Sequence, residues 1–132
     1  MVFRNDLSPC DYGPPGDRAL NVGWLDAEHE FTRGRVSELV LSRLKEFVSS
    51  GYRRTRGYHL CELCPAPSSG RKEPALTSTT LGEVRLGSAE LCVVSENGTS
   101  FISPNLLVHY VEVHGYQPPQ PFLDAIVGGK AC

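Results

Sequence analysis

Two cysteines and two histidines are the residues of this chain whose types and spacing best suit metal binding. Cys61 and Cys64 form a Cys-x-x-Cys pair within GYHLCELCP, and four residues separate His109 from His114. Thiolates and imidazoles at these spacings are typical of tetrahedral zinc sites with two cysteine and two histidine ligands. The sequence therefore predicts one structural zinc ion bound by Cys61, Cys64, His109 and His114, with no coordination position left for a substrate.

The chain around the two pairs must bring them to one ion. Gly57 and Pro65 flank the cysteine pair and favour a tight turn there. Residues five positions apart on a regular helix differ in direction by about 140°. His109 and His114 can therefore face the same ion only if the last helical turn loosens, and Gly115 is suited to a left-handed helix end directly after them.

Hydrophobic periodicity predicts an α+β fold, with a small antiparallel sheet and two main helices. Residues 19–24 alternate in polarity like a half-buried strand, and Trp24 is expected in the core. Residues 36–48 repeat apolar side chains at helical spacing, which predicts an amphipathic helix. Its N-cap is expected within residues 32–34, and Gly51 is suited to end it.

The second half of the chain contains a hairpin signal followed by a helix signal. An Asn-Gly pair lies between two apolar runs, residues 90–94 and 99–102, and this arrangement favours a β-hairpin. Ser103 and Pro104 are typical of a helix start. The second main helix is therefore expected to run from this pair to about Val113.

A chain of 132 residues suits one domain with a modest core. Within a single domain over residues 1–132, we expect an irregular N-terminal arm at 1–18, a mobile loop at 65–75 and a proline-punctuated C-terminal tail at 116–132. A weak strand is expected within residues 77–86. In the tail, Tyr116 and Phe122 are expected to pack onto the second helix, and Phe122, Ile126 and Val127 are expected to form one short amphipathic turn.

The ligand types and both local spacings resemble those of a Cys₂His₂ zinc finger. Forty-four residues separate Cys64 from His109, however, where such a finger has about twelve. The order of cysteine knuckle, Asn-Gly hairpin and helix is similar to a treble-clef zinc module, except that here the ligands come from the end of the helix. The string HYVEVHGYQPP after a Cys-x-x-Cys pair also resembles small uncharacterised bacterial proteins, over Tyr58 to Pro119. These resemblances imply an elaborated zinc-finger-like core and bring no activity with them.

Composition and charge argue against several classes of protein and partner. A net charge of −2 gives no general reason to expect binding to nucleic acid or to an anionic membrane. No stretch approaches the ~18 apolar residues of a membrane span, and Arg4 and Asp6 interrupt the apolar run that a signal peptide needs. Five scattered cysteines, an odd count, fit a reducing compartment better than a disulfide framework. We therefore expect a cytoplasmic protein without a membrane segment.

Other chemistry at the cysteine pair has less support from the sequence. His59, two residues before Cys61, is either a replacement ligand or a hydrogen-bond donor to a thiolate, and we leave it outside the ligand set. A redox dithiol would need an activating helix start, but the sequence PAPSSG that follows Cys64 cannot form one. A zinc hydrolase would need an open ligand position and a carboxylate base. Glu62 and Glu112 are close to the ligands in sequence, but exposure to solvent explains them more simply.

A cluster of basic residues makes nucleic acid the main alternative partner. Arg53, Arg54 and Arg56 precede the cysteine pair, and clustered guanidinium groups bind phosphates. The helix expected after Pro104 is apolar on all sides, as buried helices are, so it lacks the polar face with which a zinc finger reads bases. The favoured prediction is a zinc-stabilised domain that binds another protein, with nucleic-acid binding second and zinc-dependent hydrolysis third.

Overall fold

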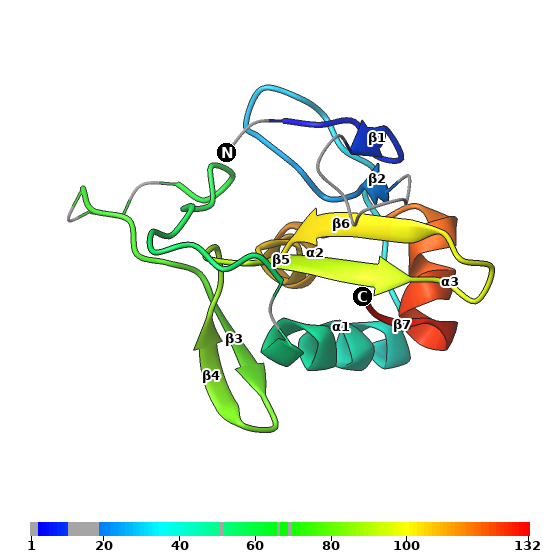
Figure 1. The fold of residues 1–132 in the computed structure, drawn as a ribbon. Coiled ribbons are helices and arrows are strands. Elements are labelled where there is room, and N and C mark those ends of the chain that lie inside the picture. The colour runs from blue at the N-terminus through cyan, green and yellow to red at the C-terminus, as the bar shows by residue number, and fades with distance from the viewer. Residues whose placement is uncertain (1–2, 11–18, 51, 66, 69) are drawn as a thin grey trace.

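Across the residues that it describes, 3–10, 19–50, 52–65, 67–68 and 70–132, the computed structural model combines a five-stranded sheet, a separate β-hairpin and three helices (Figure 1). The predicted α+β class is confirmed. The strands of the larger sheet are β1 Pro9–Cys10, β2 Ala19–Asn21, β5 Glu90–Val94, β6 Ser100–Pro104 and β7 Lys130–Ala131. Their order across the sheet is β1-β2-β6-β5-β7.

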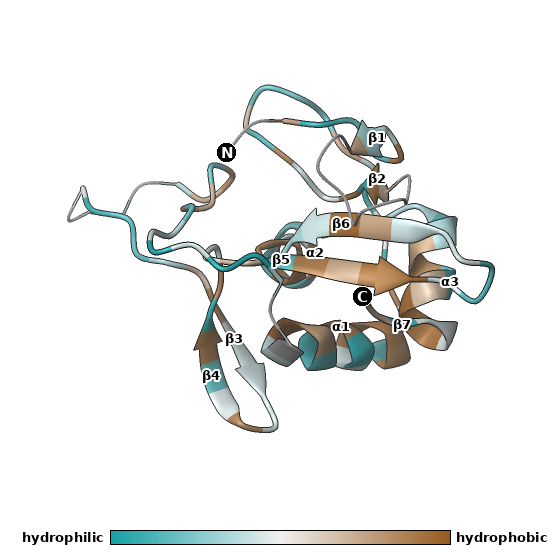
Figure 2. Cartoon of the chain, viewed as in Figure 1, coloured by the Kyte–Doolittle hydropathy of each residue, from teal (hydrophilic) through white to brown (hydrophobic). Residues whose placement is uncertain are grey.

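The central strands of this sheet bury side chains on both faces. All strand pairs are antiparallel except β2 and β6, which run parallel. Along β5, Leu91 and Val93 belong to the main core, whereas Cys92 belongs to a second buried cluster with Trp24 and Ile102. This alternation is the two-residue period of a strand, and β5 is accordingly apolar along most of its length in Figure 2. The prediction that Trp24 is a core residue is confirmed.

Three helices supply the other half of the main core. They are α1 Glu38–Ser50, α2 Leu107–His114 and α3 Gln120–Gly128. Leu44 of α1, Tyr110 of α2 and Phe122 of α3 are almost fully buried and belong to the same cluster as one face of the sheet. None of the described helices is long and apolar enough to cross a membrane.

The first helix begins later than the sequence pattern indicates. The predicted N-cap within residues 32–34 is wrong, because α1 starts at Glu38 and the Ser37 hydroxyl accepts a hydrogen bond from the Val40 amide at 3.2 Å. A serine oxygen that binds a first-turn amide is the usual N-cap arrangement. The predicted end at Gly51 lies outside the described residues.

Strands β5 and β6 pair in antiparallel register and are joined by residues 95–99. The Gly98 amide donates to the Ser95 carbonyl at 3.0 Å, and Gly98 has the left-handed φ of 88°. Asn97 and Gly98 are therefore the last two residues of a four-residue turn, not the two central residues of the tightest hairpin. Glycine is needed here because the left-handed backbone strains other residues.

The second helix also begins later than predicted. Ser103 and Pro104 end β6, where they pair with Leu91 and Glu90 of β5, so the predicted helix start at Ser103 is wrong. Pairing within the sheet holds this backbone extended, and α2 begins only at Leu107. The predicted end is confirmed, because Gly115 caps α2 in the left-handed conformation at φ 68°.

The C-terminal segment forms a longer helix than the single predicted turn. In α3, Phe122 and Ile126 are fully buried, as the amphipathic pattern indicates. Tyr116, just before α3, is also fully buried, and its hydroxyl donates to the Asp6 carboxylate at 2.7 Å. Tyr116 and Phe122 are buried as expected, but the Phe122 ring packs edge to face on Phe101 of β6, with the centroids 5.7 Å apart. Tyr116 also connects the N-terminal segment to the body.

A second, two-stranded sheet lies apart from the larger one. Its strands are β3 Leu76–Thr79 and β4 Gly82–Arg85, which form an antiparallel hairpin where one weak strand was expected. Figure 1 shows this hairpin extending away from the five-stranded sheet. Buried Thr77 anchors it, because the Thr77 hydroxyl donates to the Glu112 carboxylate of α2 at 2.5 Å.

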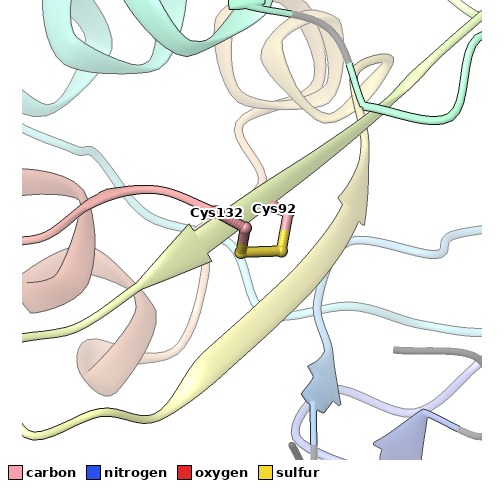
Figure 3. Close-up of a disulfide and its surroundings, with 2 residues drawn as sticks. All are labelled: Cys92 and Cys132. Carbon is pink, nitrogen blue, oxygen red and sulfur yellow. A yellow bond between two sulfur atoms is a disulfide. The ribbon is translucent and has the colours of Figure 1, made fainter. Parts of the chain in front are cut away.

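The cysteines depart from the expectation that no disulfide forms. Cys92 of β5 and Cys132 are joined by a disulfide across 40 residues, with their Cα atoms 5.2 Å apart (Figure 3). β7, which contains Lys130 and Ala131, pairs with β5 immediately before this bond. Disulfides persist mainly in oxidising compartments, so this bond counts against the reducing compartment that the cysteine count predicts.

We predict that the disulfide contributes substantially to stability, because it closes a long loop in the unfolded chain. Cys132→Ser is expected to lower the free energy of unfolding by about 2–4 kcal/mol, measured by urea denaturation. Cys10→Ala removes a buried thiol outside the disulfide and serves as the control. A reductant should destabilise the wild type and the control but not Cys132→Ser. Equal stability of wild type and Cys132→Ser would contradict the prediction.

Candidate metal centre

The structure brings the four predicted ligand side chains to one point. Ligand atoms of Cys61, Cys64, His109 and His114 all lie within 4.8 Å of one another. Cys64 Sγ lies 3.2 Å from His109 Nε2 and 3.4 Å from His114 Nε2, and Cys61 Sγ lies 3.4 Å from His114 Nε2. In a tetrahedral zinc site, ligand sulfur and nitrogen atoms are about 3.5 Å apart. The four side chains are therefore close enough to bind one metal ion of this size.

The cysteine pair lies on an irregular segment that is held against the start of β5. Tyr52 and Glu90 exchange two backbone hydrogen bonds of 2.8 and 2.7 Å, and the Thr55 amide donates to the Ser88 carbonyl at 2.6 Å. The His59 amide then donates to the Gly87 carbonyl at 2.9 Å. These backbone hydrogen bonds, and not a helix or a paired strand, position the segment that leads to Cys61.

Gly87 is the point where this segment comes closest to the sheet. A Cβ atom at Gly87 would lie only 2.4 Å from the His59 carbonyl oxygen, and the φ of Gly87 is +110°. The Gly87 amide also donates to Oδ1 of Asn105 at 2.7 Å, and Asn105 is buried just before α2. Asn105 and Gly87 thus connect the chain of the cysteine ligands to the helix of the histidine ligands. Sequence reasoning missed both residues, and their only signal was the polarity of Asn105 in an apolar run.

The end of α2 departs from regular helical geometry, which allows His109 and His114, five positions apart, to face the same point. The Gly115 amide donates to the Tyr110 carbonyl, and the Tyr116 amide donates to the same oxygen at 3.1 Å. Both bonds reach back further than the four residues of a regular α-helix, so the last turn is wider. The rings of His109 and His114 meet edge to face with their centroids 5.0 Å apart.

Neighbouring residues hold both ends of the site in place. Arg33 donates to the His114 carbonyl at 3.1 Å, and the Gly34 amide donates to the Gly115 carbonyl at 2.9 Å. On the other side, Lys72 Nζ donates to the Cys61 carbonyl at 2.9 Å. Groups that orient the ligands in this way help a site to keep its geometry.

Burial sets the protonation of the ligands. Burial lowers the pKa of His109, and the nearby His114 lowers it further. Burial also lowers the pKa of His114, with Arg33 as the second cause. Both imidazoles are therefore favoured in the neutral form that coordinates a metal. Burial raises the pKa of Cys61, so this thiol must release a proton when a metal binds.

The other candidate residues lie outside this group. His59 is exposed and does not belong to the cluster of metal-ligand side chains found among the described residues. Glu112 is held by Thr77 and by Lys45, whose Nζ lies 3.2 Å from Glu112 Oε2. Glu62 is exposed. Among the described residues, the cluster therefore contains two sulfur and two nitrogen ligands and no carboxylate.

The fold and this centre define a small α+β domain with a Cys₂His₂ group able to bind a metal ion. The chain belongs to the family described as a domain of unknown function (DUF7919), whose model matches residues 2–127. All four ligand residues lie within the matched part. Comparison with curated proteins and with solved structures gave no significant match.

We predict that Gly87 cannot be replaced without loss of the metal centre. Gly87→Ala should lower the free energy of unfolding by about 2 kcal/mol or more beyond the effect of Gly82→Ala. Gly82 is the matched control, because its φ of +103° causes similar backbone strain while a Cβ there meets no atom within 4 Å. Chemical denaturation and metal titration of both variants measure the difference. Equal behaviour of the two alanines would show that the contact with His59 is unimportant.

Proposed function

We propose that this protein is a zinc-stabilised domain in which Cys61, Cys64, His109 and His114 bind one structural zinc ion. The observation that carries the proposal is the convergence of these four ligand atoms within 4.8 Å. Two thiolates and two imidazoles in tetrahedral reach are the ligand set of structural zinc sites. Four protein ligands complete the coordination sphere, so the ion stabilises the fold and is not a site of catalysis.

Zinc would strengthen the attachment of the segment 52–65 to helix α2, which few other contacts provide. Residues 52–65 contain no helix or paired strand beyond a single bridge at Tyr52, and they bury few apolar side chains. A metal bound to Cys61 and Cys64 would fasten this segment to the buried helix α2. Structural zinc contributes on the order of 10 kcal/mol to folding in small domains, which exceeds what isolated backbone hydrogen bonds give.

The zinc proposal predicts about one zinc ion per chain in protein purified without added metal. Elemental analysis measures the ion, and circular dichroism measures the fold. Cys64→Ser and His114→Ala should lose both zinc and cooperative unfolding, because the buried partners are left without an ion. His59→Ala is the control, since His59 is exposed and outside the cluster. A folded wild-type protein without zinc would refute the proposal.

Because a structural metal does not catalyse a reaction, we propose that the biological role is binding and that the partner is another protein. Apolar side chains on and beside the β3–β4 hairpin support this choice. Leu76 and Leu81 are 50% and 85% exposed, and Val113 of α2 is 61% exposed. Exposed apolar groups of this kind are typical of protein contact surfaces.

Nucleic acid remains the second candidate, because Arg53, Arg54 and Arg56 all lie on an exposed stretch of chain. The first half of α2 is buried, so sequence-specific base reading by that helix is not favoured. Zinc-dependent hydrolysis is the least favoured candidate, because Glu112, the nearest acidic residue on α2, is engaged by Thr77 and Lys45.

The protein-partner proposal predicts that hairpin substitutions abolish binding without unfolding. Leu76→Ser/Leu81→Ser should lose a partner that the wild type captures in a pull-down, with unchanged zinc content. Val127→Ser, an exposed apolar residue on α3, is the control and should retain the partner. Fluorescence anisotropy with single- and double-stranded oligonucleotides provides the opposing test. Salt-dependent binding that disappears on replacing the three arginines would favour nucleic acid instead.

A further inference from the structure

A cavity lies directly beside the metal centre. Its volume is about 610 Å³, which falls in the range of about 300–1,000 Å³ typical of small-molecule sites. Cys64 and His109 form part of one wall. The segment after the cysteine pair also lines the cavity, through Pro65, Pro67, Arg71 and Ala75.

The cavity combines positive charge with apolar surface. Arg71 is exposed to the cavity and makes no ion pair or hydrogen bond with another described residue. Lys72 also lines it, and Glu73 contributes a single negative charge. A zinc ion with two thiolate ligands adds no net charge, so the cavity keeps an excess of one positive charge. Pro65, Pro67 and Ala75 provide the apolar surface.

One hydrogen bond joins two of the residues that line the cavity. Lys72 Nζ donates to the Cys61 carbonyl at 2.9 Å, so the segment that contains Arg71 is attached to the chain of the metal ligands. This bond uses one of the three N–H donors of the Lys72 ammonium group, whereas the Arg71 guanidinium has all of its donors free of the other described residues. Arginine binds a carboxylate through two parallel hydrogen bonds, which lysine cannot do.

We propose that this cavity binds a small organic carboxylate, with the carboxylate on Arg71 and the apolar body against Pro65, Pro67 and Ala75. The inference deepens the proposed function and rests on it in one respect, because zinc would fix the wall formed by Cys64 and His109. The ligand lies beside the metal and does not coordinate it, since four protein ligands complete the coordination sphere.

The test is an NMR titration of the full-length, zinc-loaded protein with sodium phenylacetate at constant ionic strength. Phenylacetamide is the neutral probe of the same shape, and sodium acetate is the probe without the apolar body. Phenylacetate should cause saturable amide shifts at residues lining the cavity, with an affinity at least tenfold above that of either control. Failure to saturate, or equal affinity for phenylacetamide, would overturn the proposal.

Variants assign the effect to Arg71. Arg71→Gln should weaken phenylacetate binding at least fivefold and leave zinc content unchanged. Arg54→Gln is the matched control, because Arg54 is exposed and does not line the cavity. An unchanged affinity in Arg71→Gln would overturn the assignment even if phenylacetate binds.

Two further readouts separate this proposal from the zinc proposal. In protein containing cobalt(II) in place of zinc, the visible absorption bands should stay those of a four-coordinate ion when phenylacetate saturates. A change to a five-coordinate spectrum would overturn the placement beside the metal. One zinc per chain without phenylacetate binding would remove the cavity site alone, whereas phenylacetate binding by folded, zinc-free protein would remove the zinc site alone.

Discussion

The close contact between Gly87 and the backbone of His59 is the constraint on which the metal centre depends. Here the irregular segment packs against the chain just before β5, and a Cβ atom at Gly87 would be too close to the His59 carbonyl oxygen for this packing. The Gly87 amide is held in turn by Asn105, immediately before α2. One short series of hydrogen bonds, from the His59 amide to the Gly87 carbonyl and from the Gly87 amide to the Asn105 side chain, therefore links the segments that contain the two ligand pairs.

The sheet and the helices together hold α2 and the metal centre in place. One face of β5 and β6 and the three helices form the main core, which fixes α2 through buried residues such as Tyr110. The opposite face is covered by Trp24 and closed by the disulfide between Cys92 and Cys132. The metal centre lies at the end of α2, where the helix emerges from the core and its last turn widens at Gly115. The core thus holds the helix that carries the histidine pair, whereas a bound ion would fasten the cysteine segment to that helix.

Much of the fold could be predicted from periodicity, because amphipathic patterns report which face of an element is buried. Helix α1, strand β5 and the core position of Trp24 follow from such patterns. The boundaries could not be predicted equally well. Ser103 and Pro104 have the composition of a helix start, yet pairing with β5 keeps them in a strand, because a hydrogen-bonded partner outweighs a weak local preference. The Cys92–Cys132 disulfide could not be predicted from the sequence either, because an odd cysteine count does not say which thiols meet in space.

For the candidate site, the sequence by itself determined the ligand types and their local spacings, because thiolate and imidazole chemistry is a property of single residues. It also indicated the glycine that releases the end of α2. Only the tertiary structure decided that Cys64 and His109, separated by 44 residues, meet at one point, that His59 lies outside the cluster, and that a charged cavity adjoins Cys64 and His109. These features depend on contacts such as Lys72 with Cys61, which arise from packing between distant segments and leave no periodic trace in the chain.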